Sequence, residues 1–189
     1  MRGTTSVGGL IGAAGSRYGS YTDSFATGAV SGETNVGGLI GSADNVAIAG
    51  TYATGAVTGS ARGSGIGGLV GSLFASSLAD SYASGRVSGA NAVGGLVGTS
   101  FATTLANVQA RGAVTGTLGA GENVGGLIGR SEIDDITGAR AQNGVRGRVN
   151  VGGLIGRRTG GTLSDASATG PVSGTRNVGP VIGLDDPAP

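Results

Sequence analysis

The sequence predicts an all-β fold: a three-sided, right-handed parallel β-solenoid of about six coils, each about 27–31 residues long, a period typical of solenoids. Two repeated motifs are the basis of this prediction. A motif close to ATGAVSG recurs six times, and a motif close to VGGLIG recurs seven times. Right-handed crossovers are the rule between parallel strands. The seven GGL motifs begin at Val7, Val36, Ile66, Val93, Val124, Val151 and Val178.

The spacing between the two motifs keeps the coils in register. The interval from the start of a GGL motif to the valine of the next second motif is the same in five coils, as from Val36 to Val57, and slightly longer in the first. The remaining interval is the same in four coils and is longer only after Val57 and Val114. Nearly all length variation therefore lies at one corner, as pairing along the other sides requires. We expect one domain over residues 1–184 and a short acidic, proline-containing tail over residues 185–189.

Composition excludes several classes of function. The net charge is +1, and all 12 basic residues are arginine, which gives no electrostatic case for nucleic acid. The chain has no cysteine and no apolar run of transmembrane length, so we expect neither disulfides nor membrane insertion. Glycine supplies 43 residues without a collagen period, and the small apolar residues indicate a narrow core. We expect no cofactor and no metal.

Alternation within the second motif predicts which side chains face inward. Side chains alternate along a strand, so the alanine, glycine and valine of this motif share one face, and their small size indicates the core. The predicted core valines are Val30, Val57, Val87, Val114, Val145 and Val172. The opposite, solvated face carries Thr27, Thr54 and Ser84 in one column and Ser31, Thr58, Ser88 and Thr115 in a second.

The GGL motif predicts another strand, and both of its alternating columns are apolar. Either the paired glycines bend the chain so that leucine and isoleucine both face inward, or the leucines form an external ridge that marks an assembly surface. We favour the bend. Asparagines before the motif, such as Asn35 and Asn123, predict a left-handed turn. The leucines assigned to the core are Leu39, Leu69, Leu96, Leu127 and Leu154.

These motifs resemble the GLUG repeat family. The resemblance rests on VGGLIG at Val36, IGGLVG at Ile66, and companion stretches such as SYASGRVSG, and it extends from about Val7 to Gly183. It implies a β-solenoid of the kind found in large bacterial surface and secreted proteins, including filamentous-haemagglutinin-like adhesins and some immunoglobulin-A-directed peptidases. There the repeats lie in stalks outside any catalytic domain, so the resemblance implies no catalytic or ligand residues. AQNGVRG in the fifth coil and Pro180 in the last motif depart from the pattern.

Three groups of side chains are candidate sites. An outward stack of Phe25, Tyr52 and Tyr82 either binds sugar rings or stiffens the sheet. The threonine and serine columns resemble the flat arrays of ice-binding solenoids, although arginines interrupt them, and such residues also suit any exposed strand. The nearby carboxylates Glu132, Asp134 and Asp135 could serve polysaccharide cleavage, but we favour a surface salt-bridge cluster. The repeat lacks the aspartate of calcium-binding nonapeptides.

We therefore expect a non-enzymatic, extracellular or cell-surface structural solenoid, either an adhesin stalk or a filament subunit. No capping helix is predicted outside the coils, and open strand edges template further pairing. The chain is therefore either an excised piece of a longer protein or a unit whose end-to-end contact is its function, and the start at Met1 and the short tail favour the complete, self-assembling unit. The expected partner is a second copy, stacked head to tail, or a flanking solenoid domain. The alternative is a module that binds glycan or ice through the aromatic or threonine and serine columns.

Overall fold

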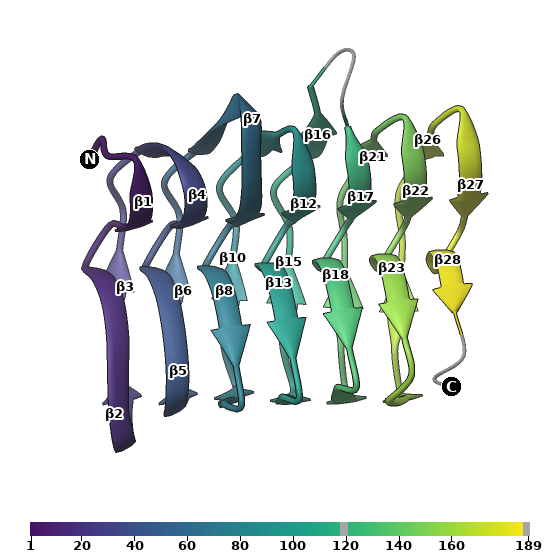
Figure 1. Ribbon diagram of the computed structural model, residues 1–189. Helices are drawn as coiled ribbons and strands as arrows, with labels where there is room; N and C mark the ends of the chain where they lie inside the picture. Colours follow the sequence, from purple (N-terminus) through teal and green to yellow (C-terminus); the bar gives the residue numbers. More distant parts are fainter. Residues whose placement is uncertain (118–120, 187–189) are drawn as a thin grey trace.

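The computed structural model describes residues 1–117 and 121–186, without the side chains of residues 16–18, and consists of parallel strands stacked as a β-solenoid (Figure 1). It has about seven turns rather than the six expected, because the seventh GGL motif adds a partial coil of its own. The described residues form no helix, and hence none able to cross a membrane. Three sheets run along the solenoid, as the three-sided prediction requires.

The first sheet contains the strands that lead into the GGL turns and the valine strands of the second motif. The former are β1 (Thr5–Gly8), β4 (Val30–Gly37), β7 (Val57–Gly67), β12 (Asn91–Gly94), β17 (Glu122–Gly125), β22 (Val149–Gly152) and β27 (Arg176–Gly179). The latter are β11 (Val87–Gly89), β16 (Val114–Gly116), β21 (Val145–Arg146) and β26 (Val172–Ser173); in β4 and β7 one strand serves both parts.

The second sheet begins after each GGL turn and continues through the middle of the coil. It comprises β2 (Ile11–Thr22), β5 (Ile40–Ala49), β8 (Val70–Phe74), β9 (Ser77–Ala79), β13 (Val97–Phe101), β14 (Thr104–Ala106), β18 (Ile128–Glu132), β19 (Asp135–Thr137), β23 (Ile155–Thr159), β24 (Thr162–Ser164) and β28 (Ile182–Asp186). The third sheet takes only a short strand from each coil. Its strands are β3 (Phe25–Ala26), β6 (Tyr52–Ala53), β10 (Tyr82–Ala83), β15 (Gln109–Ala110), β20 (Arg140–Ala141) and β25 (Ser167–Ala168).

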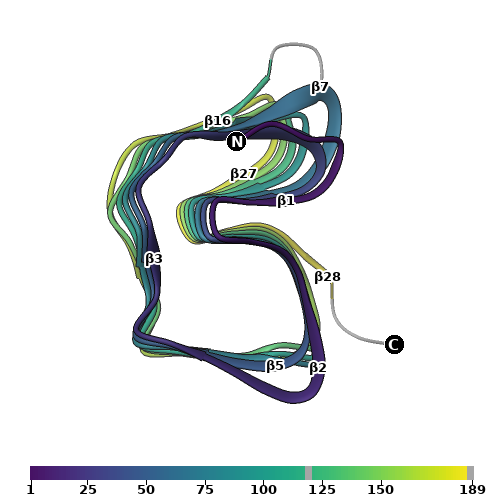
Figure 2. The same cartoon turned by 90° about the vertical axis from the view of Figure 1, so that its left-hand side faces the viewer.

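The GGL motif makes a reversal of the chain that points into the solenoid. Viewed along the axis, the wall of each coil folds inward between β1 and β2, and the later coils repeat this path (Figure 2). The two limbs touch backbone to backbone: a Cβ on Gly37 would overlap the carbonyl oxygen of Ile40 and lie 2.8 Å from the amide nitrogen of Gly71. At the tip, a Cβ on Gly38 would lie 2.8 Å from the Cβ of Ala53 in the third sheet. The first two GGL glycines therefore allow the wall to reach across the coil.

This inward fold divides the interior into two separate hydrophobic clusters. The second-motif valines pack against the first residue of each GGL motif, as Val57 does with Val36 and Ile66. The GGL leucines and isoleucines lie in the larger cluster with the third-sheet alanines. Leu39, Leu69, Leu96, Leu127 and Leu154 are at most 1% exposed, so the bend is the arrangement found and no leucine ridge forms. Val172 is half-buried in the last complete coil, and Leu10 of the first coil is exposed.

Residues with positive φ mark the three corners of the coil. The asparagine corner before the GGL turn is as predicted, with φ of 52° at both Asn35 and Asn123. At the other two corners the left-handed position is filled by aspartate, asparagine or glycine in some coils, which tolerate it. In three coils it is filled by Ala75, Ala102 and Ile133, with φ of 44°, 51° and 54°. Neighbouring coils impose this conformation on residues that do not favour it.

Candidate interaction surfaces

The predicted aromatic column forms a continuous ladder on the third sheet. The rings of Phe25 and Tyr52 stack with centroids 5.1 Å apart and an interplanar angle of 5°, and Tyr52 and Tyr82 stack at 5.1 Å and 4°. The guanidinium of Arg111 lies 5.9 Å from the centroid of Tyr82 and covers the face of this ring that does not stack on Tyr52. The inner ring faces are thus covered, and the ladder presents ring edges and tyrosine hydroxyls to solvent. A sugar ring that stacks on an aromatic face would find only the outer face of Phe25.

The hydroxyl columns lie beside this ladder. Thr27, Thr54 and Ser84 are exposed and follow the third-sheet strands, and their column continues as Arg111. In the second column Ser31, Thr58, Ser88 and Thr115 are paired across neighbouring strands, and Thr115 is followed by Arg146. Thr58 is exposed, and the other three are half-buried. The hydroxyl surface is therefore three or four coils long, and arginines bound it at one end.

Sequence reasoning missed a second aromatic pair. Phe74 of β8 and Phe101 of β13 stack at 5.2 Å and 7°, and their exposed fractions are 46% and 38%. A depression of about 250 Å³ lies against them and extends to the ion pair of Arg130 and Glu132. Asp44 and Glu132 occupy the same column on either side of the two phenylalanines. The column as a whole is therefore not aromatic, and the sequence pattern does not single it out. The two phenylalanines are separated by one coil length in the sequence, and this spacing was the available signal.

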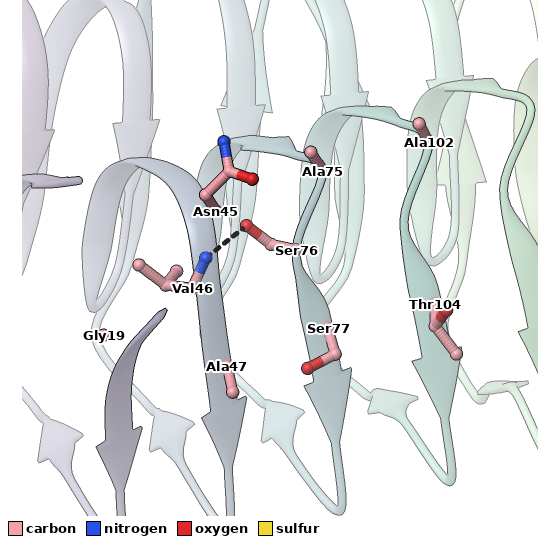
Figure 3. Close-up of a pocket in the computed structure, with 9 residues that line it drawn as sticks. All are labelled: Gly19, Asn45, Val46, Ala47, Ala75, Ser76, Ser77, Ala102 and Thr104. Atoms are coloured by element: carbon pink, nitrogen blue, oxygen red, sulfur yellow. Dashed lines mark hydrogen bonds between the residues drawn. The ribbon is translucent and has the colours of Figure 1, made fainter. Parts of the chain in front are cut away.

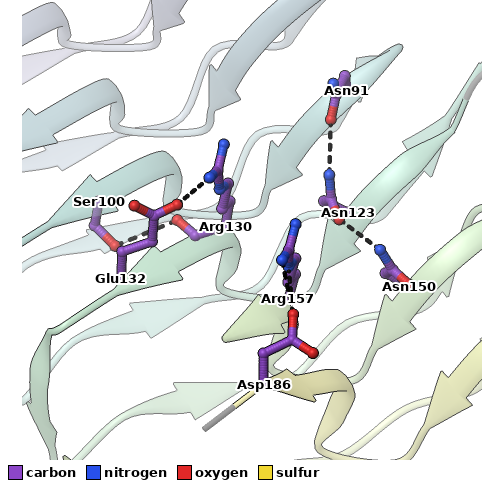
Figure 4. A network of polar contacts seen from close by, with 8 residues as sticks. All are labelled: Asn91, Ser100, Asn123, Arg130, Glu132, Asn150, Arg157 and Asp186. Atoms are coloured by element: carbon purple, nitrogen blue, oxygen red, sulfur yellow. Dashed lines mark hydrogen bonds and ion pairs between the residues drawn. The ribbon is translucent and has the colours of Figure 1, made fainter. Parts of the chain in front are cut away.

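The three candidate carboxylates, Glu132, Asp134 and Asp135, lie in different environments. Glu132 pairs with Arg130 on the surface, as the salt-bridge interpretation predicts (Figure 4). Asp135 is exposed and accepts a hydrogen bond from Thr162 Oγ1 at 2.7 Å. Asp134 is buried with 1% exposure. They form no shared acidic site, and no group of three or more potential metal ligands occurs in the described part of the chain.

Asp134 is the centre of a buried polar network at one corner. One carboxylate oxygen accepts hydrogen bonds from the hydroxyls of Ser100 and Ser131, both at 2.5 Å. The other accepts from Thr103, from its hydroxyl at 2.8 Å and its backbone N–H at 3.0 Å. Buried charges are tolerated when they are fully hydrogen-bonded. The carboxylate thus joins two coils at this corner.

The corresponding corner of earlier coils uses a hydroxyl instead. Ser76 Oγ accepts a hydrogen bond from the backbone N–H of Val46 at 3.1 Å (Figure 3). It also donates to the carbonyl of Phe74. Beside it is a depression of about 440 Å³. Its lining is small and uncharged, with Asn45 and Thr104 as its larger polar residues. This lining offers no acid, base or nucleophile pair.

An asparagine ladder runs along the corner before the GGL turns. The side-chain amide of Asn123 donates to Asn91 at 2.9 Å, and Asn150 donates to Asn123 at 2.8 Å (Figure 4). Asn177 donates in turn to Asn150 at 2.7 Å. Every donor points toward the preceding coil. The two ends of the ladder therefore differ chemically. At the C-terminal end, the Oδ1 of Asn177 is left as an acceptor for a further coil.

Two ion pairs hold the last strand, β28, to β23. Arg157 contacts Asp186 at 2.7 Å (Figure 4), and Arg158 makes two hydrogen bonds to Asp185 at 2.8 and 2.7 Å. Asp185 and Asp186 thus belong to the final strand, and the predicted tail over residues 185–189 begins two residues too early. The hydrogen bonds from Arg158 are the main cause that lowers the pKa of Asp185, and those to Asp185 raise the pKa of Arg158.

The lowered pKa of Asp185 predicts that β28 loosens in acid. A carboxyl whose pKa is lower in the folded state stabilises the fold above its unfolded pKa, here about 3.8, and this stabilisation disappears as the pH falls through the folded pKa. We expect amide exchange of residues 182–186 to accelerate, relative to β18, when the pH falls below about 4. Hydrogen exchange at several pH values measures this. In Asp185→Asn the strand should exchange faster at neutral pH already, and equal pH dependence in both proteins would contradict the assignment.

Comparison with protein families supports the resemblance drawn from the sequence. The family model described as the GLUG motif matches residues 62–88, which run from β7 through the Ile66 turn to the Val87 strand. Comparisons with curated proteins and with solved structures give no significant match.

Proposed function

We propose that this solenoid, whose residues 62–88 carry a GLUG motif, is a non-enzymatic structural rod outside the cell or on its surface. Its role is that of an adhesin stalk or of a filament subunit whose coils stack end to end. The GLUG motif and the β-solenoid fold are both consistent with a structural repeat protein. The finer proposal is supported by the recurrence of the same columns at the two end faces.

The end faces carry the same columns in the same order. Unpaired strand edges lie at both ends of the described coils, and a strand edge accepts another strand. Apolar side chains are uncovered there, with Leu10 55% exposed at one end and Val178 45% exposed at the other. A further coil placed on either face would continue these columns, except where the register of β2 shifts between Gly15 and Gly19. The first-coil residues Val7, Ile11 and Ala26 share their columns with Val178, Ile182 and Ala168 of the last coil.

The asparagine ladder supports stacking in the same direction. Asn177 Oδ1 lacks a donor among the described residues, and the first-coil member of its column is Ser6, whose hydroxyl can donate. Head-to-tail contact would therefore extend the ladder, whereas contact between two identical ends would place like groups together. A heterologous contact of this kind gives an open filament.

Electron microscopy of the purified chain across a concentration series tests this proposal. We expect rods whose length increases with concentration, and we expect Val178→Asp to give only short rods because it buries a charge in the end contact. Thr54→Asp, which adds the same charge to a side surface, should assemble as the wild type does. Short rods at every concentration would overturn self-assembly. The stalk role is tested separately by antibody labelling of intact cells, which should succeed if the solenoid lies on the cell surface. Labelling only after the cells are permeabilised would overturn the stalk role.

A further inference from the structure

The third sheet and the adjoining valine strands of the first sheet carry exposed positive charge and no negative charge on their outward side. We define the arginine face as the outward side chains of residues 25–31, 52–58, 82–88, 109–115, 140–146 and 167–173, which are aligned across the coils. These segments contain no aspartate or glutamate. They contain four arginines, all exposed: Arg86, Arg111, Arg140 and Arg146.

These four arginines differ from other arginines nearby because no carboxylate among the described residues pairs with them. Arg130, Arg157 and Arg158 each make an ion pair on the second sheet. None of the four arginines on the arginine face makes an ion pair with any residue that the structure describes. A net charge of +1 for the whole chain therefore conceals a local excess of positive charge. Such an excess attracts anions even when the protein is nearly neutral.

Neutral hydrogen-bonding groups lie between the charges. Gln109 Nε2 donates to Gln142 Oε1 at 3.1 Å, and Gln109 is the partner of Arg140 on the adjacent strand. Arg111 lies over Tyr82, so its guanidinium is held at one end of the aromatic ladder. Neighbouring coils are about 4.8 Å apart. The face thus offers anion-binding groups one coil apart, with hydroxyl and amide groups between them.

We infer that the arginine face binds an acidic polysaccharide, with the arginines on its carboxylate or sulfate groups and the tyrosine, glutamine and threonine side chains on its hydroxyls. Guanidinium groups bind such oxyanions through paired hydrogen bonds. The closed ring faces of the aromatic ladder disfavour single-stranded nucleic acid, which binds by stacking bases on open aromatic faces. They equally disfavour a neutral glycan held by ring stacking. This inference is independent of end-to-end assembly.

Binding of the full chain to defined polymers tests the inference. The probes are alginate and chondroitin sulfate as acidic polysaccharides, dextran as the neutral polysaccharide, and oligothymidylate as the nucleic acid. The test variant is Arg111→Gln with Arg140→Gln. The matched control is Arg62→Gln with Arg176→Gln, two exposed arginines outside the face, which gives the same change in net charge. Thermal melts of both variants establish that they fold.

The expected result is saturable binding of at least one acidic polysaccharide, weakened by salt, and none of dextran. The test variant should lose about tenfold in affinity, which corresponds to about 1.4 kcal/mol, and the control less than twofold. Equal losses in both variants would show unspecific charge attraction and overturn the site. Oligothymidylate bound as tightly as the polysaccharide would overturn the choice of ligand, and no binding to any acidic probe would overturn the whole inference.

Discussion

Replacing Gly94 by alanine is expected to prevent folding or to lower the free energy of unfolding by at least about 4 kcal/mol, a large part of the total stability of an ordinary domain. Gly94 lies in one limb of a GGL reversal. A Cβ there would overlap the carbonyl oxygen of Val97 and lie 2.7 Å from the amide nitrogen of Gly129 and the carbonyl oxygen of Leu127. All three are buried backbone atoms fixed by neighbouring coils, so no flexible side chain can yield.

Gly28→Ala is the matched control, because a Cβ on Gly28 meets nothing within 4 Å and its φ is not in the left-handed region. We expect its stability to change by less than about 0.5 kcal/mol. Denaturant unfolding followed by circular dichroism measures both variants. A Gly94→Ala protein as stable as Gly28→Ala would mean that the two limbs of the reversal lie further apart than described.

Replacing Asp134 by alanine is expected to cost about 3–5 kcal/mol, the second largest effect. The substitution removes the acceptor of four hydrogen bonds and leaves the hydroxyls of Ser100, Ser131 and Thr103 in a buried corner. Asp134→Asn keeps the volume and one good acceptor. Since a serine hydroxyl can also accept from the new amide, we expect an intermediate loss of about 1–2 kcal/mol.

Asp135→Ala controls for the loss of a carboxylate at a neighbouring position. Asp135 is exposed and accepts a single hydrogen bond from Thr162 Oγ1, so its removal should cost less than about 0.5 kcal/mol. Denaturant unfolding of the three variants gives the order. Equal stability of Asp134→Ala and Asp135→Ala would contradict a structural role for the buried network.

The repeat was sufficient to predict parallel coils, three sheets and their register, because columns of valine, leucine and alanine recur at one coil length. It was insufficient for the path of the wall. Strict two-residue alternation would place Val36 and Ile40 on one face, yet they lie in different hydrophobic clusters. Two-residue alternation holds only along a continuous strand, and the reversal at Gly37 and Gly38 interrupts it. A Cβ at Gly37 would overlap the carbonyl oxygen of Ile40 in the same motif and meet backbone atoms of the adjacent coil. Both distances arise only once the chain has reversed, so the letters of the motif do not contain them.

The candidate surfaces were predictable only where a residue type repeated. The aromatic ladder followed from three aromatic residues in one column. The role of Asp134 did not follow from the sequence, because it depends on hydroxyls from Ser100 and Thr103 one coil earlier. The arginine face was equally obscure, since Arg86, Arg111, Arg140 and Arg146 are spread over several columns. Their common surface becomes evident only when the coils are aligned in three dimensions.

Because each coil pairs only with its two neighbours, the length of the solenoid can change by the gain or loss of whole coils. Each added coil extends the reach by about 4.8 Å, and duplication of one repeat, such as the segment from Val151 to Asn177, supplies a coil without altering contacts elsewhere. Insertions that are not whole coils occur at the corner before the GGL turn, where β7 is lengthened, and within β2 of the first coil, where the register with β5 shifts. Reach can thus change in whole steps while cross-section, stiffness and side surfaces stay constant.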